Sequence, residues 1–121
     1  MVCLRNCFKL LGRKDNPYSY MGKANVYVQP SRHEGYCTTT MEAKIIGKVV
    51  ITSDLDSFKE QFTNEVDGFI LDKKPSSFVK VISQLYQNRD SLMKIEQRLK
   101  KENFEFNESI EELKYLGEGT I

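Results

Sequence analysis

Residues Gln29 to Gly47 read QPSRHEGYCTTTMEAKIIG, and the rest of the chain is organised around them. An apolar run, Asn25 to Val28, precedes this stretch and predicts a short strand. A polar loop follows, and a helix is expected from about Thr38 to Ile46, with Gly47 at its C-cap. A strand that leads through a loop into a helix brings backbone N–H groups and the positive end of the helix dipole to one point. The sequence therefore predicts a binding point for phosphate or another anion at the start of this helix.

Two glutamates, Glu34 in the loop and Glu42 on the helix, lie eight positions apart around this point. Carboxylates accept charge-assisted hydrogen bonds from hydroxyl groups, and one carboxylate can hold both hydroxyls of a cis-diol. Plainer interpretations stay open for both. Glu34 fits a solvated loop, and Thr39 followed by Glu42 has the spacing of a helix capping box.

The other segments alternate between strand-like and helix-like patterns, which predicts an α/β fold with a parallel sheet of about four strands flanked by helices. The expected strands are Cys7–Leu11, Asn25–Val28, Val49–Thr52 and Gly68–Leu71. The expected helices are Tyr18–Gly22, Thr38–Ile46, Ser57–Phe62, Pro75–Gln87, Asp90–Lys101 and Glu108–Leu116. Apolar positions three and four apart predict the buried faces of the last three: Phe78, Val81, Ile82 and Leu85; Leu92, Ile95 and Leu99; Ile110 and Leu113. We expect one domain over residues 1–121, with a flexible tail at 117–121.

The composition excludes several classes of protein. There are 18 basic and 17 acidic residues, a net charge of +1, which argues against a nucleic-acid-binding protein that depends on electrostatics. No apolar run approaches the roughly 20 residues of a membrane span, and no signal peptide is visible. Cys3, Cys7 and Cys37 are odd in number and lack zinc-type spacing, so free thiols in a reducing cytosol are expected. The absence of a Gly-x-Gly-x-x-Gly motif leaves a dinucleotide-binding domain without support.

The whole ordered string resembles the Glu-x7-Glu motif of retaining nucleotide-sugar glycosyltransferases, glycosyltransferase family 4, which have the GT-B fold. The matching residues are Val26-Tyr27-Val28, Pro30-Ser31, Arg32-His33-Glu34-Gly35, Glu42-Ala43, Gly47-Lys48 and Val49-Val50-Ile51. The resemblance covers Phe8 to about Leu116. It matches only the second half of the C-terminal, donor-binding domain, a partial Rossmann-like sheet.

This resemblance implies an enzyme that transfers a sugar from a nucleotide-diphosphate donor, expected to be a UDP-sugar, to an acceptor hydroxyl with retention. The acceptor would be a glycan or a lipid-linked sugar in polysaccharide or glycoconjugate synthesis. Family members need no cofactor and no divalent metal for transfer. The expected location is the cytoplasm or, for a peripheral protein, the inner membrane face.

The resemblance also implies roles for individual residues. Glu34 would be the catalytic residue, beside the donor sugar, and Glu42 would accept hydrogen bonds from the ribose hydroxyls. Four consecutive residues, Gly35, Tyr36, Cys37 and Thr38, would offer backbone N–H groups to the sugar and diphosphate. An ordinary helix start with Thr38 or Thr39 as the N-cap is the alternative. Arg13 would lie by the nucleotide base, although a solvated turn arginine is an equal alternative.

Other polar residues in the motif region have structural interpretations. His33, the only histidine, is expected to be a surface or packing residue. Asp54 and Asp56 follow a strand but are better explained as solvated loop residues than as metal ligands. Ser31 is expected to hydrogen-bond within the loop, because no His–acid pair accompanies it as a nucleophile would require.

The resemblance places the family's first two donor-domain strands and its acceptor domain outside these 121 residues. In the nucleotide-binding strand order 3-2-1-4-5-6, Phe8–Leu11 would be strand 3, separated from its neighbours. We expect it to dock beside Asn25–Val28, or two chains to pair edge to edge, because an open edge leaves backbone groups unpaired. We also expect the isolated chain to be inactive. The alternative function is a non-catalytic module that pairs with a partner chain or with itself through the open edge.

Overall fold

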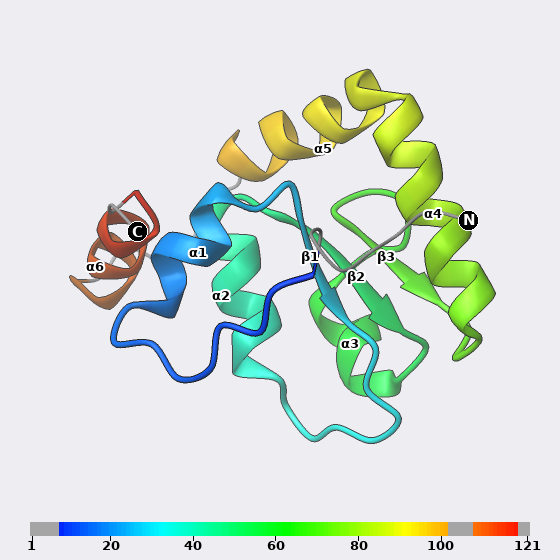
Figure 1. Cartoon of the computed structure of the whole chain (residues 1–121), viewed down its shortest axis with the longest axis horizontal. Coiled ribbons are helices and arrows are strands. Elements are labelled where there is room, and N and C mark those ends of the chain that lie inside the picture. The colour runs from blue at the N-terminus through cyan, green and yellow to red at the C-terminus, as the bar shows by residue number, and fades with distance from the viewer. Residues whose placement is uncertain (1–7, 102–107, 119–121) are drawn as a thin grey trace.

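The computed structural model of the chain describes residues 8–101 and 108–118, and it has three layers, with a parallel β-sheet between two sets of helices (Figure 1). The sheet has the strand order β1-β2-β3, where β1 is Val26–Gln29, β2 is Val49–Ser53 and β3 is Gly68–Leu71. Both pairs are parallel, with Val26 opposite Val49 and Val50 opposite Gly68. The predicted α/β class and the neighbouring order of these three strands are confirmed.

The helices are α1 (Pro17–Lys23), α2 (Thr38–Ile46), α3 (Asp56–Gln61), α4 (Pro75–Gln87), α5 (Arg89–Lys101) and α6 (Glu108–Gly117). Each lies within one residue of its predicted bounds. The predicted C-cap glycine is confirmed, since Gly47 has a left-handed φ of 92° and its N–H bonds back into α2. Within the described residues, no helix has the length and apolar character needed to cross a membrane.

The central strand β2 is buried along its whole length, because helices cover both faces of the sheet. Val49 and Ile51 point into one core, which α4 and α5 close with Phe78, Leu85, Leu92, Ile95 and Leu99. Val50 points into the other core, with Met21 of α1, Ala43 of α2 and Phe62. A continuous β-branched run is typical of a parallel strand buried on both sides. The buried faces predicted for α4 and α5 are confirmed except at Ile82, which is 38% exposed.

Strand β1 separates its side chains between these two cores. Val26 and Val28 pack on the α4–α5 side, whereas Tyr27 packs on the α1–α2 side. This alternation is the period of two that a strand imposes. It decides on which side of the sheet each residue of the motif lies.

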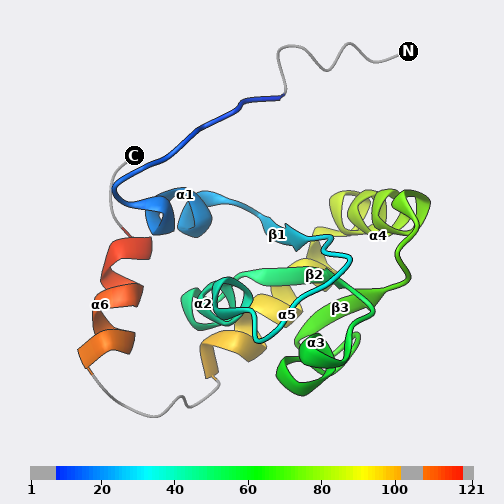
Figure 2. The same cartoon turned by 90° about the horizontal axis from the view of Figure 1, so that it is seen from below.

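Helix α6 returns to pack beside α1 and α2 (Figures 1 and 2). The helices α1 and α6 approach closely at two glycines: a Cβ on Gly22 would overlap the carbonyl oxygen of Gly117 and lie 2.7 Å from its carbonyl carbon. The side-chain amide of Asn16 also donates to the Leu116 carbonyl at 3.2 Å. The predicted tail is therefore wrong at its first residue, because Gly117 is buried and ends α6. Residues 119–121 lie outside the described residues.

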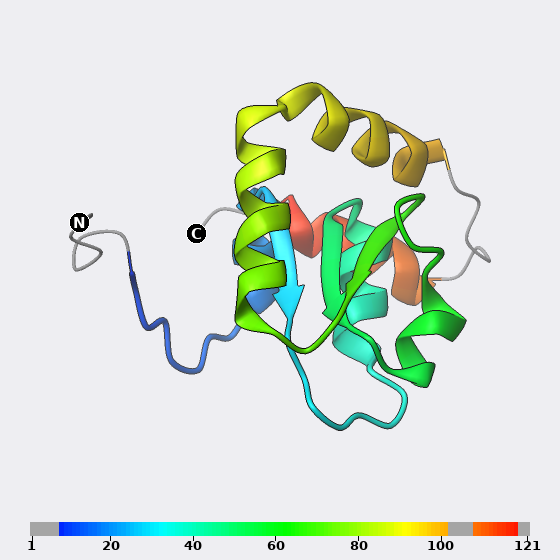
Figure 3. The same ribbon diagram turned by 90° about the vertical axis from the view of Figure 1, so that its right-hand side faces the viewer.

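The predicted strand at the N-terminus is wrong over its described part. Residues 8–11 have no strand structure and are exposed, with Phe8 at 71% and Leu10 at 86%. Figures 2 and 3 show this segment standing clear of the sheet. Docking beside β1 within the same chain is therefore also wrong. The physical reason is that neighbouring backbone is needed to satisfy a strand's N–H and C=O groups, and β1 in the described chain pairs only with β2.

Three further predictions concern residues whose placement is not described. Cys3 and Cys7 lie outside the described residues, as does the side chain of Ile110. Cys37 is described and is a buried free thiol, as expected.

Candidate functional site

The loop between β1 and α2 carries the predicted site, at the carboxyl end of β1 (Figure 1). The N-cap of α2 is Cys37, whose backbone is extended and whose side chain makes no capping hydrogen bond. The alternatives with Thr38 or Thr39 as N-cap are therefore wrong, because both residues lie within the helix. The predicted capping box of Thr39 and Glu42 is wrong for the same reason, because Thr39 is not the N-cap. The start of α2 thus offers N–H groups that no side chain of its N-cap occupies.

A buried polar cluster fixes the position of this helix start. The Thr40 hydroxyl lies 2.6 Å from Gln61 Oε1 and 2.9 Å from the Cys37 carbonyl oxygen. Gln61, at the end of α3, also donates its amide to the Cys37 carbonyl at 3.0 Å. Thr40 is fully buried and Gln61 nearly so. The cluster holds the first turn of α2 against α3 and so positions the helix start.

Glu34 is exposed, but its carboxylate is oriented by a chain of hydrogen bonds from β1. The Ser31 hydroxyl donates to Glu34 Oε1 at 2.8 Å, and the Gln29 amide lies 2.9 Å from the same Ser31 hydroxyl. The Tyr27 hydroxyl in turn donates to Gln29 Oε1 at 2.7 Å. Ser31 also accepts, through its carbonyl, a hydrogen bond from the Ser53 hydroxyl of β2. The predicted role of Ser31 within the loop is therefore confirmed, and Glu34 has a defined direction.

Glu42 lies on the side of α2 that faces α1 and α6. Its carboxylate accepts a hydrogen bond from the Tyr18 hydroxyl at 3.2 Å. It lines a cavity of about 360 Å³ together with Tyr18 of α1 and residues of α6, namely Glu112, Leu113 and Leu116. Burial raises the pKa of Tyr18, and the charge of Glu42 and their hydrogen bond raise it further. Glu42 is thus a half-buried carboxylate with a hydroxyl partner at the wall of a cavity.

Tyr27 and Glu34 lie on the same side of the sheet, because the Gln29 side chain contacts both the Tyr27 hydroxyl and the Glu34 carboxylate. Burial is the main cause that raises the pKa of Tyr27, and electrostatic interactions with Cys37, Glu42 and Glu34 raise it further. Tyr27 points toward the α1–α2 layer. Helix α2, which carries Glu42, packs on this same side through Ala43 and Ile46, but the Glu42 cavity is not lined by Glu34.

The four residues between the glutamates that were predicted to bind the donor differ in exposure. Cys37 is buried, whereas Gly35, Tyr36 and Thr38 are exposed, Tyr36 at 63%. A Cβ on Gly35 would meet nothing within 4 Å. The fold itself therefore gives no steric reason for glycine here, and a close approach by a ligand would supply one. Their roles in donor binding remain predictions.

The remaining candidates are dispersed. Arg13 is exposed in the segment before α1 and is not brought to either glutamate by any described contact. His33 is exposed, as expected of a surface residue. Lys59 lies 3.0 Å from Asp54 and 3.8 Å from Asp56, so both acids face a lysine at the surface.

Sequence reasoning missed a buried lysine on α2. Lys44 is 5% exposed, donates to the Gln61 carbonyl at 3.0 Å and forms an ion pair with Asp67 at 3.1 Å. Its Nζ also lies 5.4 Å from the centre of the Phe62 ring. The available signal was spacing, because Lys44 lies four positions after Thr40 and residues four apart share one face of a helix. Lys44 connects α2 to the segment between α3 and β3.

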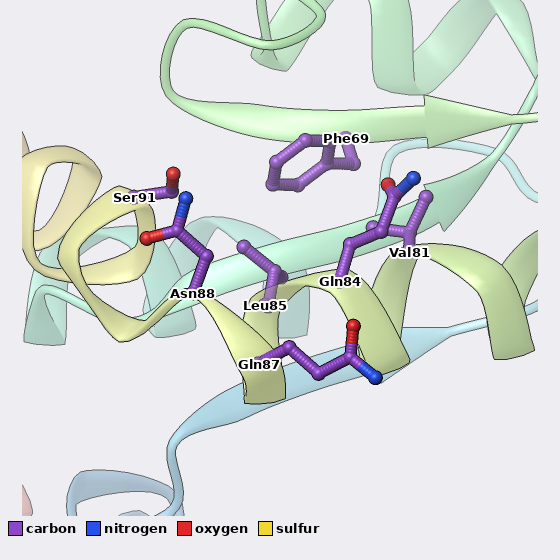
Figure 4. Close-up of a pocket in the computed structure, with 7 residues that line it drawn as sticks. All are labelled: Phe69, Val81, Gln84, Leu85, Gln87, Asn88 and Ser91. Atoms are coloured by element: carbon purple, nitrogen blue, oxygen red, sulfur yellow. The ribbon is translucent and has the colours of Figure 1, made fainter.

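A cavity of about 430 Å³ lies away from the glutamates, between β3 and the α4–α5 layer (Figure 4). Phe69, Val81 and Leu85 form its apolar part, and amides of α4 surround them. It is on the other face of the sheet from Tyr27. We therefore assign it no part in the predicted site.

A parallel sheet with a polar loop and an uncapped helix start at the carboxyl end of a strand is the arrangement at which Rossmann-like α/β proteins bind their ligands. The chain belongs to the family described as glycosyl transferases group 1, whose model matches residues 3–103. The members of this family are, by its description, glycosyltransferases. No solved structure matches the chain significantly.

Two curated relatives support the family. The chain is 37% identical over 75 residues to the O-antigen biosynthesis glycosyltransferase WclY of Escherichia coli. The aligned stretch covers 62% of this chain and 21% of the relative. The chain is 24% identical over 107 residues to the N,N'-diacetylbacillosaminyl-diphospho-undecaprenol alpha-1,3-N-acetylgalactosaminyltransferase of Campylobacter jejuni, over 88% of this chain and 28% of the relative. The chain thus spans between about a fifth and somewhat over a quarter of the length of these relatives.

Proposed function

We propose that the chain forms the second half of the donor-binding domain of a retaining glycosyltransferase of family 4, and that the donor is a UDP-sugar. The observation that carries the proposal is the α2 helix start, which has no side-chain cap and is flanked in the sequence by Glu34 and Glu42, whose carboxylates accept hydrogen bonds from Ser31 and Tyr18. A diphosphate is attracted to such a helix start by the dipole and by the free N–H groups. The family assignment supplies the sugar-transfer chemistry.

The nucleotide would bind at Glu42. Its carboxylate already accepts a hydrogen bond from the Tyr18 hydroxyl at 3.2 Å. A ribose cis-diol offers two hydroxyls to the same acceptor, and such charge-assisted bonds are strong. We propose that the ribose joins or displaces the Tyr18 hydroxyl, while the diphosphate reaches the N–H groups of residues 35–38.

Glu34 would act at the sugar. Ser31 and Gln29 fix the direction of its carboxylate, which is the preorganisation that electrostatic catalysis needs. Positive charge that develops on the sugar ring as the diphosphate leaves would be stabilised by this carboxylate. Retention at the anomeric carbon, and the absence of any need for a metal, follow from the proposed family.

The acceptor would be a glycan or a lipid-linked sugar. The names of the two relatives support this, since one is an O-antigen biosynthesis enzyme and the other is named for an undecaprenyl-diphosphate-linked sugar. We propose that the protein acts in surface-polysaccharide or glycoconjugate synthesis. Its location would be the cytoplasm, or the cytoplasmic face of the inner membrane.

We propose that the 121-residue chain alone does not turn over. In the family, an arginine and a lysine that hold the leaving diphosphate belong to donor-domain strands that this chain does not match. Removing one donor of this kind costs about 100- to 1000-fold in rate. Sugar transfer by the purified chain would contradict this part of the proposal.

A second candidate function is a non-catalytic module that pairs through the free edge of β1. The exposed apolar side chains of Phe8 and Leu10 favour it, because β1 is an edge strand in the described sheet. Light scattering of the purified chain distinguishes the two candidates. A dimer that a Leu10→Lys variant dissociates would support the module, and a monomer without affinity for another polypeptide would contradict it.

Calorimetric titration with UDP and UDP-sugars tests the donor proposal. We expect Glu42→Gln to weaken binding about tenfold, since one charged acceptor becomes neutral and such bonds differ by about 1–1.5 kcal/mol. Glu112→Gln is the matched control, because Glu112 lines the same cavity from α6 but has no proposed contact with ribose. Equal weakening in both variants would indicate a general effect of charge and would contradict the role of Glu42.

A further inference from the structure

A second cavity lies at the carboxyl ends of all three strands, on the α4 side of the sheet. Its volume is about 350 Å³, within the usual size range of small-molecule sites. Val28 near the end of β1, Ser53 at the end of β2 and Lys73 just after β3 all line it. In open parallel α/β sheets, ligands bind outside the carboxyl ends of the strands. The position is therefore one where a ligand site is expected.

Two cations face this cavity, Arg32 from the loop after β1 and Lys73 from the loop after β3. Neither forms an ion pair with any residue in the part of the chain that the structure describes. They come from segments about forty residues apart in the sequence, and the fold brings them to one cavity. Their charges are thus available to an anion.

The acids adjacent to these cations are already engaged elsewhere. Asp72 accepts hydrogen bonds from the Ser77 hydroxyl at 2.6 Å and from the Lys74 N–H at 3.0 Å. Glu34 accepts a hydrogen bond from the Ser31 hydroxyl. Neither acid lines the cavity. The local charge facing the cavity is therefore positive.

The remaining wall is apolar. Pro30 lies on the loop, Pro75 begins α4, and Phe78 is 8% exposed at the base. Inorganic phosphate alone would leave this surface uncovered. A ligand that carries both an anionic group and a non-polar part fits the lining, because burial of apolar area adds to the charge attraction.

We propose that this cavity binds the phosphate group of an organic phosphate ester, with Arg32 and Lys73 on the phosphate and Pro30, Pro75 and Phe78 against its non-polar part. The site is separate from that of Glu42, which lies on the opposite face of the sheet. It does not depend on donor binding. The loop that carries Arg32 also carries Glu34, so a phosphate ester bound here would lie one loop away from the proposed reaction centre.

Amide-resolved NMR titration of the 121-residue chain tests the site with three probes: geranyl phosphate, inorganic phosphate and geraniol. We expect geranyl phosphate to shift the resonances of Val28, Ser53 and Phe78 saturably. Inorganic phosphate is expected to bind more weakly, and geraniol more weakly still. Equal affinity for inorganic phosphate would overturn the apolar half of the proposal, and equal affinity for geraniol would overturn the anionic half.

The double variant Arg32→Gln, Lys73→Gln is expected to weaken geranyl phosphate binding about tenfold, as for two solvent-exposed charge pairs. The matched control is Lys80→Gln, Lys94→Gln, which removes the same charge from exposed positions of α4 and α5 outside the cavity. The control should bind like the original chain. Equal weakening in both double variants, or shifts that spread over the surface without saturation, would overturn the proposal. Unchanged spectral dispersion in the variants confirms that the fold is intact.

Discussion

Replacing Gly22 by alanine tests the docking of α6, which forms one wall of the Glu42 cavity. Gly22 lies within α1, where alanine is ordinarily favoured over glycine by about 0.5–1 kcal/mol. Here a Cβ would lie 2.7 Å from the Gly117 carbonyl carbon and 3.2 Å from its Cα. Both are backbone atoms and cannot rotate away. The helix propensity and the steric overlap therefore act in opposite directions.

The size of the two effects decides the outcome. Inserting a methyl group into a well-packed contact costs about 1–3 kcal/mol, which exceeds the helix-propensity gain. We expect Gly22→Ala to lower the free energy of unfolding by about 0.5–2 kcal/mol. The loss cannot exceed the free energy of docking α6, because the helix can separate from α1 instead.

Urea denaturation measures the change in stability, and hydrogen exchange of residues 111–117 reports the docking of α6. We expect both the unfolding midpoint and the protection of α6 to fall. Gly35→Ala is the control, since its Cβ would meet nothing within 4 Å; its stability should stay within about 0.5 kcal/mol of the original. A Gly22→Ala variant that is more stable, with α6 protection unchanged, would refute the packing described above.

Three further predictions concern the supports of the site. Lys44→Met should lower the free energy of unfolding, measured by urea denaturation, by about 3 kcal/mol, because it leaves the Asp67 carboxylate without its ion-pair partner in a mostly buried pair. The double variant Lys44→Met, Asp67→Asn should recover part of this loss. No recovery would refute the stabilising role of the pair. Thr40→Val should cost about 1–3 kcal/mol by leaving Gln61 Oε1 without its donor, and an unchanged unfolding midpoint would contradict the cluster. Burial raises the pKa of Tyr27 above its usual 10.0, so the folded chain holds this proton more tightly than the unfolded chain. Its contribution to stability is complete below pH 10 and is lost as the pH rises above that; Tyr27→Phe should show a smaller loss of stability between neutral and strongly alkaline pH, and an equal loss would exclude the shift.

Local sequence patterns predicted most of the fold, because the signals lay in neighbouring residues. The β-branched run Val49-Val50-Ile51 identified the strand that is buried on both sides. Spacings of three and four placed Leu92, Ile95 and Leu99 on the buried face of α5. Gly47 ended α2 as predicted, since its left-handed φ is accessible to glycine at little cost.

What failed depended on contacts between distant segments. The apolar residues Phe8 to Leu11 read locally as a strand, but a strand also needs a pairing edge. Thr39 and Glu42 had capping-box spacing, yet Cys37 became the N-cap because buried Thr40 binds Gln61 of α3. The sequence predicts Gly117 as a tail residue, because its partner across the helix contact, Gly22, lies far away in the sequence and gives no local signal. The cavity with Arg32 and Lys73 likewise exists only once the strands are aligned.

In the proposed donor complex, the loop–helix junction holds the diphosphate of a nucleotide sugar while Glu42 holds its ribose. Amide-resolved NMR titration of the chain with a UDP-sugar tests this most directly. We expect saturable shifts of the Gly35, Tyr36, Cys37 and Thr38 amides, and weaker binding in Glu42→Gln. Saturable shifts confined to the Phe69 cavity of Figure 4, with the α2 helix start unmoved, would contradict it.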